Sequence, residues 1–310
     1  MDFRHTAFDV TNQVNTMESD AVEAEVLRIL ARRYRGARGG AVSRSFDYVS
    51  RLYFGKVQGY APCDTPYHDL QHVLEVTLAM ARLMDGHEAL GSAPSLGQRL
   101  FEFGIACALF HDSGYVRRAG DRRHSNGAAY TRTHVTRGVR MLREFLPTVG
   151  MSLLIPGAAL MHYTGYEVPV PKIRLEDPRL VVLGRMLGSA DILAQMSDRC
   201  YLEKCYFRLY PEFVAGGIDR RHNPDGTVEV IFGSAEDLIF KTPAFYRNAM
   251  SRLDRTLGGL HRAVEGHFNG RNPYLDEIGA NIRHAESIAS SRTLSLLRRQ
   301  PRATVPPMET

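Results

Sequence analysis

Apolar residues recur along most of the chain at the three- and four-residue spacing of amphipathic helices. In residues 18–35, for example, Val22, Val26 and Ile29 fall on one face, and this period is typical of a helix packed on a core. Glycine and proline interrupt the pattern between one helix and the next. Further helices are expected over residues 43–52, 66–84, 98–111, 126–145, 151–163, 180–210, 243–257 and 273–297.

One segment, residues 211–240, departs from the helical period. It contains the turn sequence NPDG, after which Val228, Val230 and Phe232 alternate with polar residues, as in a strand. We therefore expect a small extended excursion near residues 220–235, either a hairpin or an extended loop. Because few strand patterns exist to build a sheet, the sequence predicts an all-α fold, a helical bundle.

No internal repeat or clear linker divides the chain, so we expect one helical domain over residues 17–297. The helices of residues 240–297 would form a C-terminal extension of that domain. Residues 1–16 lack helical periodicity and are expected to form a flexible N-terminus. Residues 298–310 carry three prolines and are predicted to be a disordered tail.

Composition narrows the function classes. Of the 310 residues, 44% are hydrophobic and 24% are charged, as in globular proteins with a large core. The formal net charge is only +5, and the arginines are scattered along the chain, which disfavours nucleic acid as a partner. One local basic cluster stands out: Arg117, Arg118, Arg122 and Arg123, followed by His124.

The cysteine pattern and the N-terminal sequence indicate the cellular compartment in which the protein is expected. Four cysteines are too few for a disulfide scaffold at this length, and none forms a C-x-x-C pair. The start of the chain, MDFRHTAFDV, has no apolar signal-peptide core. No stretch approaches the roughly 18 apolar residues of a membrane span. We therefore expect a cytoplasmic protein without a membrane partner.

Two of the twelve histidines stand together in the segment YHDLQHV. His68 and His72 lie four residues apart on the predicted helix, so that both would project from one face. Two histidines placed in this way can bind a metal, or one can bind while the other transfers protons. The alternative is a polar helix face that happens to hold two histidines.

In the segment ALFHDSG, an apolar helix ends in the adjacent pair His111 and Asp112. Both side chains can reach one centre only near the helix end, where Gly114 allows the chain to turn. The helix dipole makes an aspartate unfavourable at this end, which argues for a compensating partner such as a cation. The alternative is that the two residues merely cap the helix.

Three further candidates lie singly in helical contexts: His134 in THVTRGV, His162 in ALMHYTG and Asp191 in GSADILAQ. A carboxylate among apolar residues, as at Asp191, needs a pairing partner or a metal, and a buried aspartate–histidine pair is the alternative. Imidazole and carboxylate ligands without cysteine suit Mn, Fe, Zn, Co or Ni. These three residues, together with His72, His111 and Asp112, suffice to bind two divalent ions bridged by Asp112. Two such ions can polarise a phosphoryl group and generate a hydroxide near neutral pH.

These motifs, in this order, resemble the H…HD…D signature of the HD superfamily of metal-dependent phosphohydrolases. YHDLQHVLEV is similar to the Y-H-N-x-x-H-A-x-x-V helix of cyclic nucleotide phosphodiesterases, and ALFHDSGY to the helix that carries the HD pair. HVTRGVRMLREFLP resembles the H-x-x-x-G helix of dinuclear members, and ALMHYTGY the histidine motif that follows it. The resemblance covers about residues 60–215 and implies an HD-type bundle over that range.

The resemblance also implies roles for single residues. Four of them would be the core metal ligands: His72, His111, Asp112 and Asp191. His134 and His162 would complete a second metal site, and His68 would protonate the leaving oxygen. Two positions depart from the pattern: Tyr115 stands where phosphodiesterases have histidine and HD-GYP enzymes have lysine, and Asp69 replaces the usual asparagine. The GYP loop is absent.

The expected function is hydrolysis of a phosphodiester or a nucleotide phosphate by a metal-activated water, with His68 and Asp112 as catalytic residues. The partner would be a small phosphorylated substrate. Arginine suits bidentate contact with phosphate, and the basic cluster follows the HD pair directly, so at least one of its residues is expected to face the mouth of the site. A solvated loop is the alternative.

Two other function classes are open. Some HD-domain relatives hold a mixed-valent di-iron centre with the same six ligands and use oxygen to cleave C–C or C–P bonds. His68 favours hydrolysis, because an oxygenase has less need of a proton donor at that place. A degenerate domain used for binding or assembly is disfavoured, since every ligand position holds a competent residue. The terminal helices are compatible with a homodimer.

Overall fold

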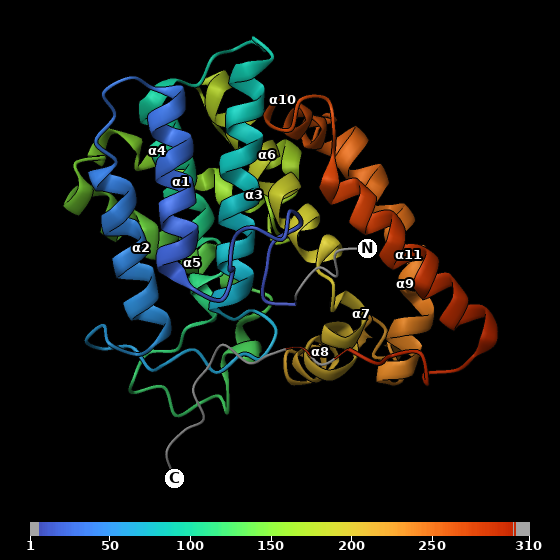
Figure 1. The fold of residues 1–310 in the computed structure, drawn as a ribbon. Coiled ribbons are helices and arrows are strands. Elements are labelled where there is room, and N and C mark those ends of the chain that lie inside the picture. The colour runs from blue at the N-terminus through green and yellow to red at the C-terminus, as the bar shows by residue number, and fades with distance from the viewer. Residues whose placement is uncertain (1–5, 300, 302–310) are drawn as a thin grey trace.

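The computed structural model describes residues 6–299 and residue 301. The described chain is mostly helical (Figure 1), which confirms the predicted all-α class. The two longest helices are α3 (Leu70–Ala89) and α6 (Pro178–Ser197). They pack along one another at the centre of the bundle, and the other helices are arranged around them.

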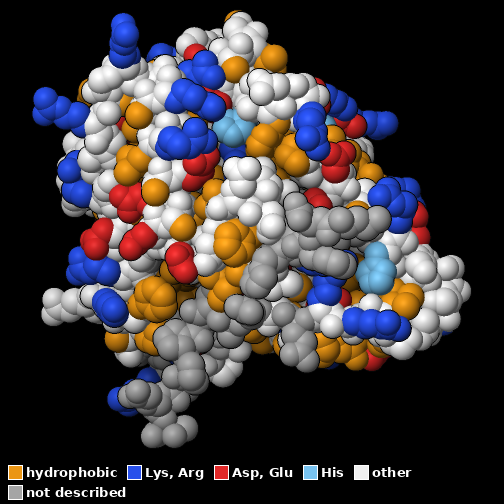
Figure 2. Space-filling view, in the orientation of Figure 1, with side chains coloured by type: hydrophobic (Ala, Val, Ile, Leu, Met, Phe, Trp, Pro, Cys, Tyr) orange, Lys and Arg blue, Asp and Glu red, His pale blue; other side chains and the backbone are white. Residues whose placement is uncertain are grey.

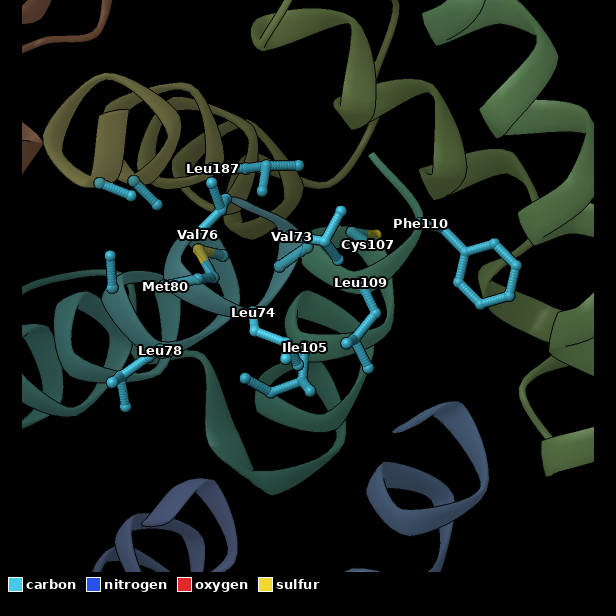
Figure 3. Close-up of a cluster of buried hydrophobic side chains, with 14 of the residues drawn as sticks. Val73, Leu74, Val76, Leu78, Met80, Ile105, Cys107, Leu109, Phe110 and Leu187 are labelled. Atoms are coloured by element: carbon cyan, nitrogen blue, oxygen red, sulfur yellow. The ribbon is translucent and has the colours of Figure 1, made fainter. Parts of the chain in front are cut away.

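α3 is the innermost helix, because every side chain from Leu70 to His87 except the half-buried Glu75 is buried. It contacts α1 (Ser19–Arg33), α4 (Gly97–Phe110) and α10 (Val264–His267) as well as α6. Figure 3 shows part of the core that α3, α4 and α6 share, with Val76, Ile105 and Leu187 among its labelled side chains. α3 also buries charged side chains, and these are paired, as Arg82 is with Asp9 (2.6 Å).

The other helices complete the bundle and extend it on one side, where α9 and α11 lie side by side (Figure 1). The remaining α-helices are α2 (Gly40–Tyr53), α5 (His134–Phe145), α7 (Tyr201–Lys204), α8 (Tyr210–Ala215), α9 (Ala235–Ser251) and α11 (Pro273–Ser291). The 3₁₀ segments are η1 (Ser113–Tyr115), η2 (Gly127–Tyr130), η3 (Leu146–Val149), η4 (Ser152–Leu154), η5 (Pro156–Tyr163), η6 (Val170–Lys172) and η9 (Leu260–Ala263). Two π-helical segments are η7 (Cys205–Leu209) and η8 (Arg252–Thr256).

A hairpin of two short strands, β1 (Arg220–His222) and β2 (Val228–Val230), confirms the excursion predicted near residues 220–235. The strands are antiparallel, with Arg221 opposite Glu229. All their side chains are exposed, so the hairpin contributes no core.

Several predicted helices have different bounds, and for two of them a polar side chain that caps the chain explains the difference. The segment predicted as a helix over residues 151–163 is 3₁₀ (η4 and η5), α9 begins at Ala235 rather than at residue 243, and α11 ends at Ser291 rather than at residue 297. α3 begins at Leu70 rather than at residue 66, since Asp69 Oδ1 accepts a hydrogen bond from the His72 amide (3.0 Å). α5 begins only at His134, after the 3₁₀ segment η2. The helix predicted over residues 180–210 breaks after α6, where Asp198 Oδ1 accepts from the Cys200 amide (2.7 Å).

The N-terminal segment was expected to be flexible, and its described part is packed. Asp9 is buried and forms an ion pair with Arg82 of α3 (2.6 Å). Phe8 and Asn15 form an isolated β-bridge that closes the segment into a loop. Residues 1–5 lie outside the described residues, and so does nearly all of the tail that was predicted to be disordered.

One described helix, α6, is long and apolar enough to cross a membrane by length and composition alone. Of its most apolar window, 61% is buried inside the protein, against α3 and its neighbours. Core helices share this composition, so it does not indicate a span. On the face drawn in Figure 2, basic and acidic side chains are interspersed over the surface.

The contact between α3 and the segment around α10 depends on two glycines. A Cβ atom on Gly86 would overlap the carbonyl oxygen of Ala263, and one on Gly266 would overlap the carbonyl oxygen of Gly86. The two backbones can therefore approach this closely only without side chains.

We expect Gly86→Ala to lower the free energy of unfolding by at least about 1–3 kcal/mol, because the added methyl group must push the two backbones apart. Gly279→Ala in α11 is the matched control, since only the mobile tip of Arg283 lies near (3.3 Å), and alanine there should stabilise the helix by up to about 1 kcal/mol. Urea denaturation of both variants measures the difference. Equal changes in the free energy of unfolding of the two variants would contradict this account of the contact.

Candidate metal centre

Five of the six predicted ligands come from four helices, α3, α4, α5 and α6, or directly follow one of them. His72 lies in the first turn of α3, and Asp191 lies in the middle of α6, which packs along α3. His111 and Asp112 follow directly after α4, and His134 is the first residue of α5. The fold therefore gathers at one place residues that are far apart in the sequence.

His72, His111 and Asp191 form a compact group, because one ligand atom from each lies within 4.8 Å of the others. Nε2 of His72 is 3.4 Å from Oδ1 of Asp191. It is also 3.3 Å from Oδ2 of Asp112, and Nε2 of His111 is 3.1 Å from that same oxygen. Imidazole nitrogens and carboxylate oxygens that converge in this way could hold a metal ion.

The other oxygen of Asp112 faces a different histidine. Its Oδ1 is 3.4 Å from Nε2 of His134, whereas Oδ2 faces His72 and His111. The carboxylate of Asp112 thus stands between two sets of nitrogen ligands. This is the arrangement that a carboxylate needs in order to bridge two ions.

Backbone carbonyls fix the orientation of two of these rings. Nδ1 of His111 donates to the Ala108 carbonyl, and Nδ1 of His134 donates to the Thr131 carbonyl, both at 2.7 Å. Each bond leaves a lone pair on Nε2, as in histidines that bind metals. Nε2 of His111 is buried, and among the described residues its contact with Oδ2 of Asp112 (3.1 Å) does not have the geometry of a hydrogen bond. A buried polar atom of this kind needs a partner, and a cation fits.

Charge interactions within the site shift the pKa values of His72 and Asp112. Burial lowers the pKa of His72, but its hydrogen bonds to Asp112 and Asp191 outweigh burial and raise the pKa to about 10. Burial raises the pKa of Asp112, but His111 and His72 outweigh burial and hold it well below its usual range. The carboxylate of Asp112 therefore stays charged and requires positive charge nearby.

The site opens on the side of three residues. The side chains of Asp191, His68 and His134 keep 23%, 14% and 14% of their surface exposed, whereas His72 and Asp112 are buried. A ligand can thus approach from this side while the other ligand atoms remain shielded from water.

His162, on η5, lies outside the compact group of three. Its Nδ1 is buried and, in the described part of the chain, has no hydrogen-bond partner. Burial lowers its pKa, and the charges of Glu167, Arg143 and His134 also act on it. A neutral imidazole with a free nitrogen is the form that binds metal.

The structure corrects the prediction that His68 and His72 share one helix face. His68 precedes α3, so that Asp69, as the cap residue, stands between it and the helix. The His68 ring instead stacks on Tyr115 (4.3 Å between centroids), which in turn stacks on His134 (4.4 Å). His68 is therefore held at the edge of the site by ring contacts.

Glu212 on α8 is a site residue that sequence reasoning missed. Its Oε2 lies 2.5 Å from Nδ1 of His68, and its Oε1 accepts from the Tyr67 amide (2.5 Å). Burial lowers the pKa of His68, but the buried Glu212 carboxylate outweighs burial and raises it. The only available signal was the four-residue spacing of Lys204, Arg208 and Glu212, which are all buried.

The two positions that depart from the HD pattern have structural roles here. Tyr115 is buried, and its ring stacks on both His68 and His134, whose own ring centroids are 6.3 Å apart. Asp69 caps α3 at the His72 amide and is paired with Arg208 (3.4 Å). Asp69 therefore fixes the backbone from which His72 projects.

Two members of the basic cluster contact the loop before α3. Arg117 pairs with Asp64 (2.7 Å) and also donates to the His124 carbonyl. Arg118 lies over the Tyr60 ring (4.2 Å). Two members, Arg122 and Arg123, are exposed. That one of these residues faces the mouth of the site stays a prediction.

Comparison of the chain with protein-family models, with curated proteins and with solved structures gives no match. The case for a function therefore depends on the geometry of the site.

The backbone after the HD pair lies against the start of α5. A Cβ atom on Gly114 would overlap the carbonyl oxygen of His134 and lie 2.9 Å from Cβ of Arg137. Only glycine permits this approach, which places Oδ1 of Asp112 near Nε2 of His134.

We expect Gly114→Ala to lower the metal content per chain, because the methyl group must move His134 away from Asp112. Gly120→Ala in the same loop is the control, since nothing lies within 4 Å of its added Cβ. Elemental analysis of both purified variants measures the effect. Wild-type metal content in a folded Gly114→Ala variant would refute the argument.

Proposed function

We propose that this protein is a dinuclear metal-dependent phosphohydrolase of the HD type, which hydrolyses a phosphodiester or a nucleotide phosphate. The observation that carries the proposal is the position of Asp112, with Oδ2 facing His72 and His111 and Oδ1 facing His134. A structural aspartate–histidine pair needs only one of these contacts.

We assign two ligand sets on this basis. The first metal site would consist of His72, His111, Asp191 and Oδ2 of Asp112. The second metal site would consist of His134, His162 and Oδ1 of Asp112. These ligands suit Mn, Fe, Zn, Co or Ni. Two such ions, when bound, supply polarisation of the phosphoryl group and a water of lowered pKa.

His68 is suited to protonate the leaving oxygen. Its Nδ1 is bound to Glu212 (2.5 Å), which leaves the Nε2 proton available. Glu212 favours the protonated ring, and the stacked Tyr115 fixes its plane. A positioned acid whose pKa lies near the working pH is what general acid catalysis requires.

We also propose a cytoplasmic setting, as the sequence analysis predicted. All four cysteines are free and buried, and burial raises the pKa of the Cys63 thiol to about 12. Such protonated thiols are unreactive and are typical of a reducing compartment.

The first test measures metal content and hydrolysis on one sample that is purified without chelator. We expect about two ions per chain and hydrolysis of bis-p-nitrophenyl phosphate or of a member of a nucleotide panel. Asp112→Asn should lose both, because a neutral amide cannot bridge two cations, whereas the exposed Asp254→Asn control should lose neither. Iron with oxygen uptake and no hydrolysis would favour the di-iron oxygenase. A protein that binds no metal would overturn the proposal.

A second test addresses the acid. We expect His68→Gln to lower kcat about 10²–10⁴-fold on an alkyl phosphodiester, but far less on a p-nitrophenyl ester, whose leaving group departs without a proton. Glu212→Gln should shift the alkaline limb of the pH profile to lower pH, because Glu212 raises the pKa of His68. An equal loss on both substrates would show that His68 is not the acid.

A further inference from the structure

The N-terminal turn of α5 is capped by a residue from another segment. Thr133, at the cap position, makes no side-chain cap hydrogen bond. Glu167 takes its place: Oε1 accepts from the Val135 amide (2.7 Å), and Oε2 accepts from the Thr136 amide (3.0 Å) and hydroxyl (2.6 Å). A carboxylate is favoured there, because the first amides of a helix lack partners and the helix dipole is positive at this end.

This cap acts on the residue that begins the helix. Oε1 of Glu167 is 3.8 Å from Nδ1 of His134, while Nδ1 donates to the Thr131 carbonyl at 2.7 Å. Glu167 therefore does not compete for the ring. It fixes the turn from which His134 directs Nε2 at Asp112 (3.4 Å).

Glu167 also lies five residues after His162 in the sequence. The intervening backbone is held from the other side by Arg252, which donates to the carbonyls of Tyr163 (2.8 Å) and Gly165 (3.2 Å). One carboxylate thus links the segment that carries His162 to the helix that begins with His134.

We propose that Glu167 is a positioning residue for the second metal site: by binding the first turn of α5, it sets His134 and His162 at the separation that one ion requires. This inference rests on the proposed function. It differs from a purely structural cap, which would affect the stability of the protein but would leave the affinity for each ion unchanged.

The test compares two cap residues. Ser234 caps α9 by accepting from the Asp237 amide (3.2 Å), away from the ligands, so Ser234→Ala removes a cap of the same kind. Chelator-stripped wild type, Glu167→Ala, Glu167→Gln and Ser234→Ala are titrated with Mn²⁺, and the free ion is counted by electron paramagnetic resonance. The signal of a coupled Mn²⁺ pair reports the second metal site independently of activity.

We expect Glu167→Ala to bind one Mn²⁺ about 10- to 100-fold more weakly, as is usual when a residue that orients metal ligands is removed, and to lose the coupled signal. The other ion should bind as in wild type. Glu167→Gln keeps one acceptor oxygen, so its affinity for Mn²⁺ should lie between those of wild type and Glu167→Ala. Ser234→Ala should bind both ions normally, even though it is less stable.

A folded Glu167→Ala variant that binds both ions as tightly as wild type would overturn the inference and leave the proposed function standing. If Glu167→Ala lowered the affinity for both ions equally, or if Ser234→Ala lowered the affinity as much as Glu167→Ala does, Glu167 would be only a structural cap. A wild-type protein that binds one ion or none would overturn both proposals, because there would be no second metal site to position.

Discussion

A carboxylate buried at the C-terminal end of a helix is the constraint on which the rest of this structure depends. The second half of α4, Phe103–Phe110, is apolar and buried, so Asp112 follows it into the interior, where the helix dipole and the loss of water both disfavour a negative charge. Compensation comes from the nitrogens of His72, His111 and His134, at 3.1–3.4 Å from its oxygens. α3 and α5 must therefore begin at this point, and their places in the bundle follow.

These helices are fixed at their ends. Asp69 caps α3 directly before His72, and Glu167 caps α5 directly after His134. Gly114 allows the backbone between α4 and η1 to touch the first turn of α5. Caps and close backbone contacts hold a side chain more precisely than packing along a helix does, because they act within one residue of the ligand. The caps at the helix termini thus determine the positions of the ligand side chains in the site.

Much of the site was predictable, because its residues contradict their surroundings. Asp112 and Asp191 are carboxylates in apolar helices, and such conflicts are visible in the sequence. Glu212 was harder to predict: α8 (YPEFVA) has only six residues, too few to show a helical period, and the role of Glu212 arises only when the fold brings it to His68. The helical spacing of His68 and His72 was misleading, because α3 begins only after the Asp69 cap and His68 lies before it.

A proton and a metal cation can each supply the positive charge that this centre requires. Asp112 and Asp191 raise the pKa of His72 to about 10 because they place negative charge against its ring. A cation at Nε2 supplies the same positive charge and must displace that proton, which couples metal affinity to pH. The buried carboxylates that make the fold demand positive charge are thus the groups that make it a candidate metal site. Stability and chemistry at the end of α4 have one physical origin.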